Sequence, residues 1–341
     1  MEHQIGCEKC GKKFSSKEAL EQHFSAKHAQ SHTEHKETKK KRPVLKYSII
    51  VILFIIGVIF IGKIFGSNNS TNDVSTNQLY PIRAITHAHG LSVDVADSNK
   101  LYIATHHGLL VLMNEKDLYK VGKSEDDYMG FSPHPSNSNI FFSSGHPSRG
   151  GNIGFQKSED GGFTWKRISS GAYGPVDFHA MAVSQANPDI IYGYYQGNLQ
   201  RSDNGGKGWN IVNSELPHTI ALATDPQDEN KVYTATIKGL MISTNKGKDW
   251  KQLSNDLAGA QVSGIAINPK NANEMLSFSS KGMAKSTDGG KTWQIVNEKF
   301  NGQTPLYIAY DEQNPNLVYT ITETQKIYKS IDSGTTWKIA Y

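Results

Sequence analysis

The sequence predicts an all-β domain over residues 80–341, folded as a six-bladed β-propeller. Three observations lead to this prediction. An eight-residue motif recurs with its starts 44, 41, 43 and 44 residues apart, the five Trp residues of the chain all stand at its last position, and apolar, strand-like segments precede each copy. Periods of this length with several strands each are typical of propellers, in which every repeat forms one four-stranded blade.

The repeated motif has the chemistry of a β-hairpin turn. Its copies are SEDGGFTW from Ser158, SDNGGKGW from Ser202, STNKGKDW from Ser243, STDGGKTW from Ser286 and SIDSGTTW from Ser330. We expect the first Ser and the third Asp or Asn to accept hydrogen bonds from turn amides, the fifth residue, always Gly, to adopt a positive φ, and the Trp to pack into the blade. The motifs therefore build the fold, and we expect none of their Asp residues to be catalytic.

The first of the six units lacks the motif but keeps its frame. Lys116 stands where the Gly belongs, and Tyr119 occupies the position of the Trp. Each unit begins with an innermost strand, such as LSVDV or IALAT, and continues with a second strand, such as LYIAT or KVYTAT. The sequence does not predict how the ring of units closes.

The motif resembles the Asp box of BNR repeats, which occur in sialidases, sortilin-type receptors and the photosystem II assembly propeller. The resemblance covers nearly all of residues 87–341. Segments such as HAHGLSV and DFHAMAV are also similar to bacterial propellers labelled glycosylhydrolase-like, mostly of unassigned activity, so both resemblances imply a fold rather than a reaction. Sialidase chemistry is not expected, because that family uses an arginine triad. Residues 67–341 contain only Arg83, Arg149, Arg167 and Arg201, and two of these lie next to motifs.

Residues 1–30 predict a small ββα zinc finger. The spacing C-x2-C-x12-H-x4-H resembles that of C2H2 fingers, and Phe14 and Leu20 supply the two apolar core positions. The expected zinc ligands are Cys7, Cys10, His23 and His28. The positions that would contact DNA bases hold Ser16, Ala19 and Gln22, without an Arg to grip guanine. We therefore expect a structural zinc site in a cytoplasmic contact module, with nucleic-acid binding weak at best.

Residues 47–65 predict a single transmembrane helix, because the uncharged apolar run from Tyr47 to Gly62 approaches the length that a bilayer requires. A cleaved signal peptide is the alternative, but a predominantly polar segment of 46 residues precedes the run and no typical cleavage site follows it. A basic juxtamembrane linker occupies residues 31–46, and a polar tether occupies residues 66–79. The positive charges before the helix predict a single-pass protein of the cell membrane, with a cytoplasmic N-terminus and an extracellular propeller.

The charge is unevenly distributed. Residues 1–46 hold 11 Lys and Arg against 6 acidic residues, whereas the chain from Ser67 onward holds 24 against 26. The nearly neutral propeller is therefore not expected to bind nucleic acid. Both cysteines lie in the finger, so the propeller must be stabilised by packing rather than by disulfides.

Alignment of the innermost strands brings histidines to one face of the ring. At one equivalent position stand His89, Met129, His179, His218, Ser263 and Leu306. Two residues earlier, on the same side of an extended strand, stand His87, Asp127, Asp177, Leu216, Gln261 and Thr304. The turn between the second and third strands should reach the same face, and it carries His106, His107 and His146. His134 and the motifs map to the opposite face.

The tentative propeller site thus contains His87, His89, His106, His107, Met129, His146, His179 and His218. Imidazole suits zinc, copper, iron and nickel, a thioether favours Cu(I), and Asp127 or Asp177 can serve as a ligand or can orient a His. We expect copper or zinc here. A metal-free site for an anion, protein or glycan, and a purely structural role, remain open as alternatives.

The function we expect is that of a membrane-anchored, externally displayed binding or assembly module with its site at one face of the channel. The alternative is a glycoside hydrolase acting on cell-surface or extracellular glycans. Such an enzyme needs two carboxylates that flank the scissile bond, and Asp127 and Asp177 are the candidate pair.

Overall fold

The computed structural model describes residues 5–7, 10, 13–14, 77–297, 300 and 302–341, in two units that divide between Val74 and Ser75. In the first unit, β1 (Ile5–Gly6) pairs antiparallel with β2 (Lys13–Phe14). Cys7 is buried and Cys10 is exposed in the hairpin between them. This pairing suits the start of a ββα finger, but His23 and His28 lie outside the described residues.

The predicted transmembrane segment, residues 47–65, and the basic linker before it also lie outside the described residues. In the ranges that the structure does describe, no helix is long and apolar enough to cross a membrane. Both the finger and the membrane anchor therefore remain predictions.

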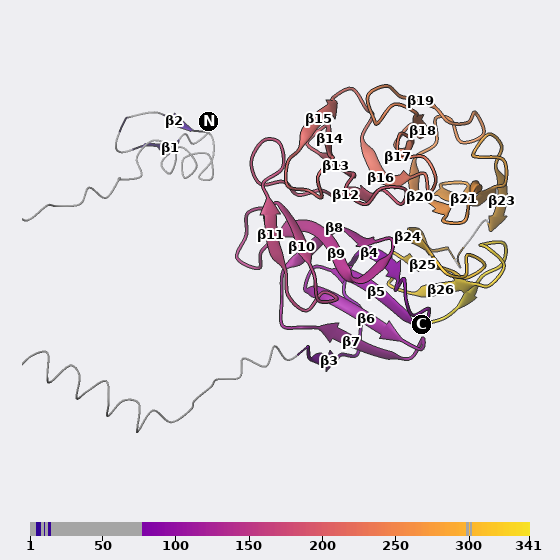
Figure 1. The fold of residues 1–341 in the computed structure, drawn as a ribbon, viewed down its shortest axis with the longest axis horizontal. Helices are drawn as coiled ribbons and strands as arrows, with labels where there is room; N and C mark the ends of the chain where they lie inside the picture. Colours follow the sequence, from indigo (N-terminus) through magenta and orange to yellow (C-terminus); the bar gives the residue numbers. More distant parts are fainter. Residues whose placement is uncertain (1–4, 8–9, 11–12, 15–76, 298–299, 301) are drawn as a thin grey trace, which may run out of the picture. The chain divides into compact units, whose positions relative to one another are not determined.

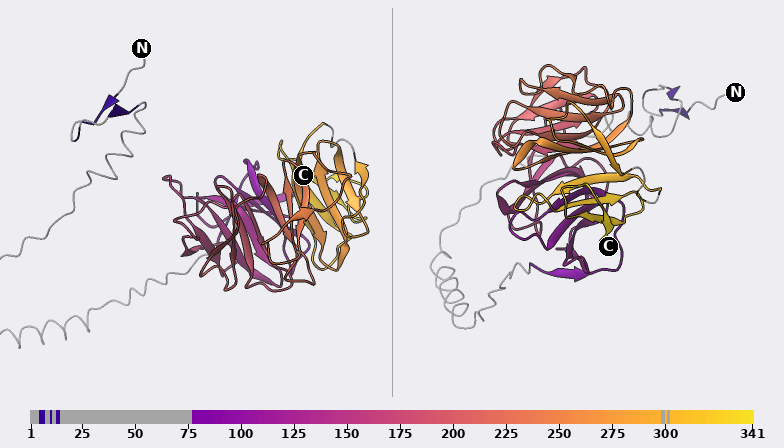
Figure 2. Two further views of the ribbon diagram at one scale, coloured as in Figure 1. Left: turned by 90° about the horizontal axis from the view of Figure 1, so that it is seen from above. Right: turned by 90° about the vertical axis from the view of Figure 1, so that its right-hand side faces the viewer.

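Residues 77–341 form six antiparallel sheets arranged in a ring, as Figures 1 and 2 show. The innermost strands of blades one to six are β4 (Ala88–Val93), β8 (Asp127–His134), β12 (Ala180–Val183), β16 (Thr219–Thr224), β20 (Val262–Asn268) and β24 (Pro305–Tyr310). The second strands are β5 (Lys100–Thr105), β9 (Asn137–His146), β13 (Ile191–Tyr195), β17 (Val232–Thr236), β21 (Asn271–Ser279) and β25 (Val318–Thr322). The predicted six-bladed propeller is confirmed.

The two outer strands of each blade complete the sheets. The third strands are β6 (Gly108–Met113), β10 (Phe155–Ser158), β14 (Asn198–Ser202), β18 (Gly239–Ser243), β22 (Gly282–Ser286) and β26 (Ile327–Ser330). The fourth strands are β7 (Asp117–Val121), β11 (Lys166–Ser169), β15 (Asn210–Asn213), β19 (Lys251–Gln252), β23 (Gln294–Asn297) and β27 (Lys338–Ile339). Blade one has a fifth strand, β3 (Leu79–Pro81), which pairs with β7. Leu79, expected at the end of the tether, therefore belongs to a sheet.

The hydrophobic core lies between adjacent blades. Each blade is covered by a neighbour on both faces, so its middle strands read as continuous apolar or small residues rather than as an alternation. In β17, whose sequence is VYTAT, all five residues are buried. The burial of both faces explains why strand-like segments without period-two alternation predicted the blades correctly.

The ring closes without a strand shared between the first and last blades. Blade six is built from its own four strands, and it packs against blade one through a cluster that includes Leu91, Ile103 and Ile321. The hydroxyl of Tyr319 donates a hydrogen bond to Glu115 Oε1 at 2.7 Å, and Lys329 forms an ion pair with the same carboxylate. Side-chain packing and this polar group therefore take the place of a shared sheet.

The five repeated turns have the predicted hydrogen bonds. In the copy from Ser202, the Ser oxygen accepts from the Gly206 amide at 2.9 Å, and Asn204 Oδ1 accepts from the Gly208 amide at 2.8 Å. Trp209 Nε1 donates to Gly206 O at 3.0 Å, and Gly206 has a φ of 83°. The turns lie beside the loops in which the innermost strands end, as the bond from Gly205 N to Asp189 O shows. They thus face away from the His-bearing end.

In blade one, a tight turn replaces the motif. Asn114 and Glu115 have φ values of 53° and 56°, and Lys116 N donates to Met113 O at 3.0 Å. Positive φ at both central residues is the requirement of a type I′ hairpin turn. This short turn leaves Tyr119 half-buried at the position that Trp occupies in the other blades.

Candidate metal centre

The first cluster at the channel mouth comes from blade one. His87, His89 and His106 each offer a ring nitrogen, and these atoms lie within 4.8 Å of one another. His89 is the extra residue of a β-bulge, because Ala88 pairs with Thr105 while Gly90 pairs with Ala104. A bulge re-aims a side chain out of the regular pleat. The turn between β5 and β6 supplies His106, so two loops of one blade converge.

Asp127, the first residue of β8, joins this cluster from blade two. Its Oδ2 lies 2.8 Å from His106 Nδ1, and its Oδ1 lies 3.7 Å from His89 Nε2. His89 Nε2 is also 3.0 Å from His106 Nε2. The rings of His89 and His106 thus lie against one carboxylate whose side chain is 13% exposed.

The second cluster joins blades two and three. His146 ends β9, and Asp177 and His179 precede β12, with their ligand atoms within 4.8 Å of one another. Asp177 Oδ2 lies 2.8 Å from His179 Nε2 and 3.0 Å from His146 Nε2. The Asp177 side chain is only 7% exposed, so its charge is shielded from water.

The tautomer of His146 follows from its other nitrogen. His146 Nδ1 lies 2.8 Å from Gly151 O, and a carbonyl oxygen can only accept, so Nδ1 carries the proton. In neutral His146 the Nε2 lone pair therefore faces a carboxylate oxygen at 3.0 Å. Two acceptors at this distance repel unless a proton or a metal ion lies between them. A backbone carbonyl that fixes Nδ1–H is the usual orienting contact of a metal-bound histidine.

Both carboxylates have an oxygen that accepts no hydrogen bond from the described residues. Asp127 Oδ1 and Asp177 Oδ1 are buried and form no hydrogen bond with the described residues. An unpaired oxygen of a buried carboxylate raises the free energy of the folded state unless a cation is close. The residues present therefore fit a divalent transition metal at either cluster.

Burial controls the charge of His89. Removal from water lowers the pKa of His89 from 6.5 to about 4, although Asp127 raises it in part. His89 is therefore neutral at pH 7, which is the form that ligates metals. In contrast, the hydrogen bond to Asp177 raises the pKa of His179.

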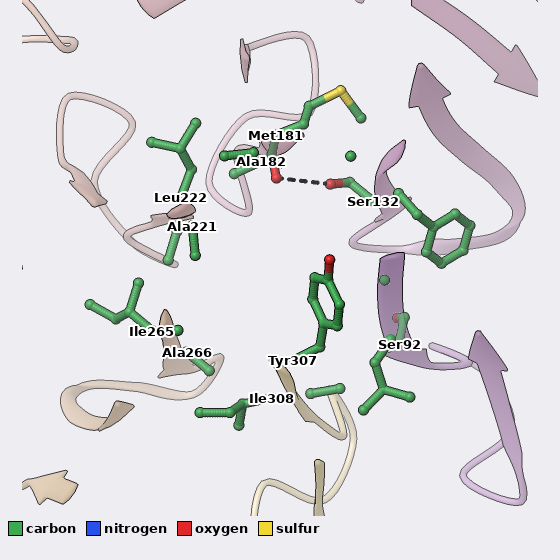
Figure 3. A pocket seen from close by; sticks show the side chains of 18 of the residues that line it. Ser92, Ser132, Met181, Ala182, Ala221, Leu222, Ile265, Ala266, Tyr307 and Ile308 are labelled. Atoms are coloured by element: carbon green, nitrogen blue, oxygen red, sulfur yellow. Dashed lines mark hydrogen bonds between the residues drawn. The ribbon is translucent and has the colours of Figure 1, made fainter. Parts of the chain in front are cut away.

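Both clusters open into one cavity. The cavity has a volume of about 230 Å³, is bounded by all six innermost strands, and has both His89 and His179 in its wall. At the end where the innermost strands terminate, Gln185 and Glu312 line it, and Gln185 Nε2 donates to Glu312 Oε1 at 3.2 Å. Burial raises the pKa of Glu312 to about 7. Figure 3 shows Tyr307 reaching toward the middle of the cavity.

The structure brings together five of the eight tentative site residues, along with Asp127 and Asp177. His107 lies beside His106 but outside both clusters, with their ring centroids 6.3 Å apart. His218 is exposed beside Tyr194. Met129 is buried and does not line the cavity wall. The predicted convergence of all eight residues is therefore realised only in part.

Sequence reasoning missed Tyr307, Gln185 and Glu312. Tyr307 follows Leu306, the residue placed at the histidine-equivalent position, and a bulge between Pro305 and Tyr307 shifts the side chains of that strand. The sequence did contain a signal for Glu312, because two consecutive acidic residues, Asp311 and Glu312, follow the innermost strand of blade six.

The fold and the channel define a six-bladed β-propeller with a polar mouth. No protein-family model matches the sequence, and no curated protein is significantly similar to it. Among solved structures, the GH74 xyloglucanase from Xanthomonas campestris is similar at 16% identity, with 77% of this chain and 46% of that chain covered and a TM-score of 0.55. The gluconolactonase XC5397 from the same organism shares 12% identity, with coverages of 75% and 87% and a TM-score of 0.56.

YCF48 from Cyanidioschyzon merolae is similar at 14% identity, with 77% of this chain and 87% of that chain covered and a TM-score of 0.51. The chain spans less than half of the length of the GH74 enzymes that it matches. At these identities, the similarities establish the propeller fold and no activity.

Proposed function

We propose that this chain is a membrane-anchored, externally displayed binding or assembly propeller that holds a transition-metal ion at its channel mouth. The observation that carries the proposal is the contact of His146 Nε2 with Asp177 Oδ2 at 3.0 Å, while Gly151 O holds the other ring nitrogen of His146 as a donor. A tetrahedral zinc with bonds of about 2.0–2.1 Å separates its ligand atoms by about 3.3 Å. The observed separation is thus close to that of two ligands of one such ion.

The donor set favours zinc or Cu(II) over Cu(I). The donors that the two clusters bring together are imidazole nitrogens and carboxylate oxygens. Imidazole suits zinc and copper, whereas Cu(I) is selected by soft sulfur ligands. His146, His179 and Asp177 would hold one ion, and His87, His89 and His106 would hold another beside Asp127.

A binding role is favoured over glycoside hydrolysis, which stays the alternative. A glycosidase needs one carboxyl group to protonate the leaving group and another to act as a base or nucleophile. Asp127 and Asp177 each contact two histidines, an arrangement suited to orienting or sharing a metal ion. The similarity to GH74 enzymes supports the fold alone, whereas YCF48 has been solved bound to a D1 peptide, which makes a protein ligand a reasonable partner class.

The remaining parts of the proposal rest on the sequence. We propose that the repeated turns are Asp boxes of the BNR type, that residues 47–65 anchor the chain in the cell membrane, and that residues 1–30 form a zinc finger on the cytoplasmic side. Protease treatment of intact cells tests the topology. The propeller should be cleaved while the finger stays protected, and the reverse pattern would refute the orientation.

Metal content tests the site itself. The full-length chain is purified with Cys7→Ser and Cys10→Ser, which remove the zinc of the finger, and is analysed for zinc and copper. We expect about one to two equivalents of metal, in line with complete ligand sets at one or both clusters. His146→Ala with His179→Ala should remove the ion of the second cluster, while the exposed His218→Ala serves as the matched control. Metal-free protein, or equal metal in the cluster variant, would refute the proposal.

A further inference from the structure

The cavity behind the two clusters is small, and its wall combines apolar side chains with polar groups. Its wall includes Met181, Leu222, Ile265 and Ile308, and its volume is about 230 Å³. This is less than the volume of typical pockets for drug-sized ligands, which begin near about 300 Å³. The occupant must therefore be a small molecule, and these side chains can contact an apolar part of it.

One unused hydrogen-bond donor points into this space. Tyr307 reaches toward the centre, and its hydroxyl group forms no hydrogen bond with any residue that the structure describes. Two serine hydroxyl groups of the wall are engaged, since Ser132 Oγ donates to Met181 O at 3.3 Å and Ser92 Oγ donates to Val93 O at 3.0 Å. Burial, with a contribution from Asp127, raises the pKa of Tyr307 to about 12, so the hydroxyl keeps its proton.

The two ends of the cavity differ in charge preference. The mouth carries His89 and His179, and with metal bound it attracts an anionic or electron-donating group. The other end carries Glu312, which lies near Asp311 and disfavours a second negative charge. A ligand with one anionic end, one acceptor within reach of Tyr307 and an apolar tail satisfies all three conditions.

We infer that the channel binds a small free monocarboxylate, with its carboxylate at the His-bearing mouth, a hydrogen bond from Tyr307, and its alkyl chain along the apolar side chains of the wall toward Glu312. The inference deepens the proposed function and rests on it, because a bound metal ion would supply the main attraction for the carboxylate. A dicarboxylate should bind less well because of Glu312, and a neutral alcohol should bind less well because it lacks the anionic group.

Isothermal titration tests this ligand class on the full-length, zinc-loaded chain with the finger cysteines replaced. Hexanoate, adipate and hexanol are titrated in turn. We expect hexanoate to bind at least about tenfold more tightly than either of the others, since a hydrogen bond to a charged group alone accounts for such a factor. Equal affinities for the three compounds, or no binding of hexanoate to zinc-loaded protein, would overturn the inference.

Three variants locate the ligand. Tyr307→Phe should weaken hexanoate binding by about tenfold or more without changing the affinity for zinc, and Tyr173→Phe, at an exposed site, is the control. Glu312→Gln should strengthen adipate binding and leave hexanoate unchanged. Unchanged hexanoate binding in Tyr307→Phe overturns the inference while the proposed metal site stands.

The failure of the metal site is distinguishable from this. If zinc does not bind, the proposed function fails, and hexanoate is titrated into the metal-free chain. Binding that is lost in Tyr307→Phe then still supports the cavity assignment, because the His-bearing mouth and Tyr307 remain. If neither zinc nor hexanoate binds, both the proposed function and the inferred ligand class are overturned.

Discussion

Replacing Glu312 by Gln should make the propeller more stable at neutral and alkaline pH. Glu312 lines the channel, accepts a hydrogen bond from Gln185, and has a pKa raised from 4.5 to about 7, mainly by burial and then by the charge of Asp311. A glutamine keeps the acceptor oxygen and adds an amide donor. The Oε1 atom of Gln185 is buried and accepts no hydrogen bond from the described residues. The new amide donor would face this side chain.

The direction follows from proton linkage. The folded protein retains the Glu312 proton between pH 4.5 and about 7, whereas the unfolded chain releases it. Because the unfolded state then binds fewer protons, the free energy of unfolding of the wild-type protein falls as pH rises through this window. Glutamine does not titrate, so the variant escapes this loss.

The size of the effect follows from the same shift. At about 1.4 kcal/mol per pKa unit, the difference from 4.5 to about 7 corresponds to roughly 3 kcal/mol, and partial exposure of the side chain reduces this to about 2 kcal/mol. Glu312→Gln and wild type should have similar stability near pH 4.5. Above pH 8 the variant should be more stable by about this amount.

Urea unfolding followed by tryptophan fluorescence, repeated across this pH range, measures the difference. Glu323→Gln is the matched control, because Glu323 is exposed and its substitution should leave the pH dependence of stability unchanged. A stability difference between Glu312→Gln and wild type that is constant with pH, or that decreases as pH rises, would refute the assignment of Glu312 as a group that burial holds protonated.

Three further variants probe the fold. Gly206→Ala places a Cβ 1.9 Å from the Phe155 ring at a φ of 83°, and we expect the free energy of unfolding in urea to fall by about 3 kcal/mol. Gly161→Ala is the control, because it has open space at a φ of 76°, and its free energy of unfolding should fall by about 1 kcal/mol. Glu115→Ala removes the acceptor shared by two side chains of blade six, and it should lower the free energy of unfolding by about 2 kcal/mol; no change would exclude this contact from ring closure. The pKa of Asp332 is lowered to about 2, because hydrogen bonds from the hydroxyl and the amide of Thr336 outweigh the desolvation of the carboxylate. The free energy of unfolding of the wild-type protein should therefore fall as pH decreases from about 4 to 2. Asp332→Asn should show a smaller decrease in melting curves recorded over this range.

The sequence predicted the blades because their determinants are local and periodic. The Ser, Gly and Trp of each motif act within eight residues, and the hydrogen bonds from Gly206 N to Ser202 and from Trp209 to Gly206 O need no distant partner. Ring closure was not predictable, because Glu115 meets Tyr319 and Lys329 across more than 200 positions of sequence. No repeat signal encodes that contact, since only the first unit has the tight turn that presents Glu115.

The site was predictable to the extent that strand register determines it. His87, His89 and His179 fell correctly at the mouth because equivalent positions of repeated blades reach the same face. The bulges broke the finer prediction, because the pairing shifts between Met129 and Ser132 and again between Thr219 and Ala221. Equivalent positions in the sequence therefore do not all direct their side chains to one point, which explains why His218 lies outside both clusters and Met129 does not line the cavity.

The residues that stabilise the blades and the residues of the candidate metal site lie on opposite faces of the propeller. The turn residues that stabilise each blade lie at the face where the innermost strands end, while the histidines lie where those strands begin. Substitutions at the mouth thus leave the hydrogen bonds of the turns intact, and the bulge at His89 changes the direction of a side chain without breaking the ladder on either side. For this reason we expect His146→Ala with His179→Ala to remove the metal ion of the second cluster while the urea unfolding midpoint of the metal-free protein stays close to that of wild type. A large loss of metal-free stability would mean that the clusters are structural, and would favour the interpretation in which these histidines only complete the fold.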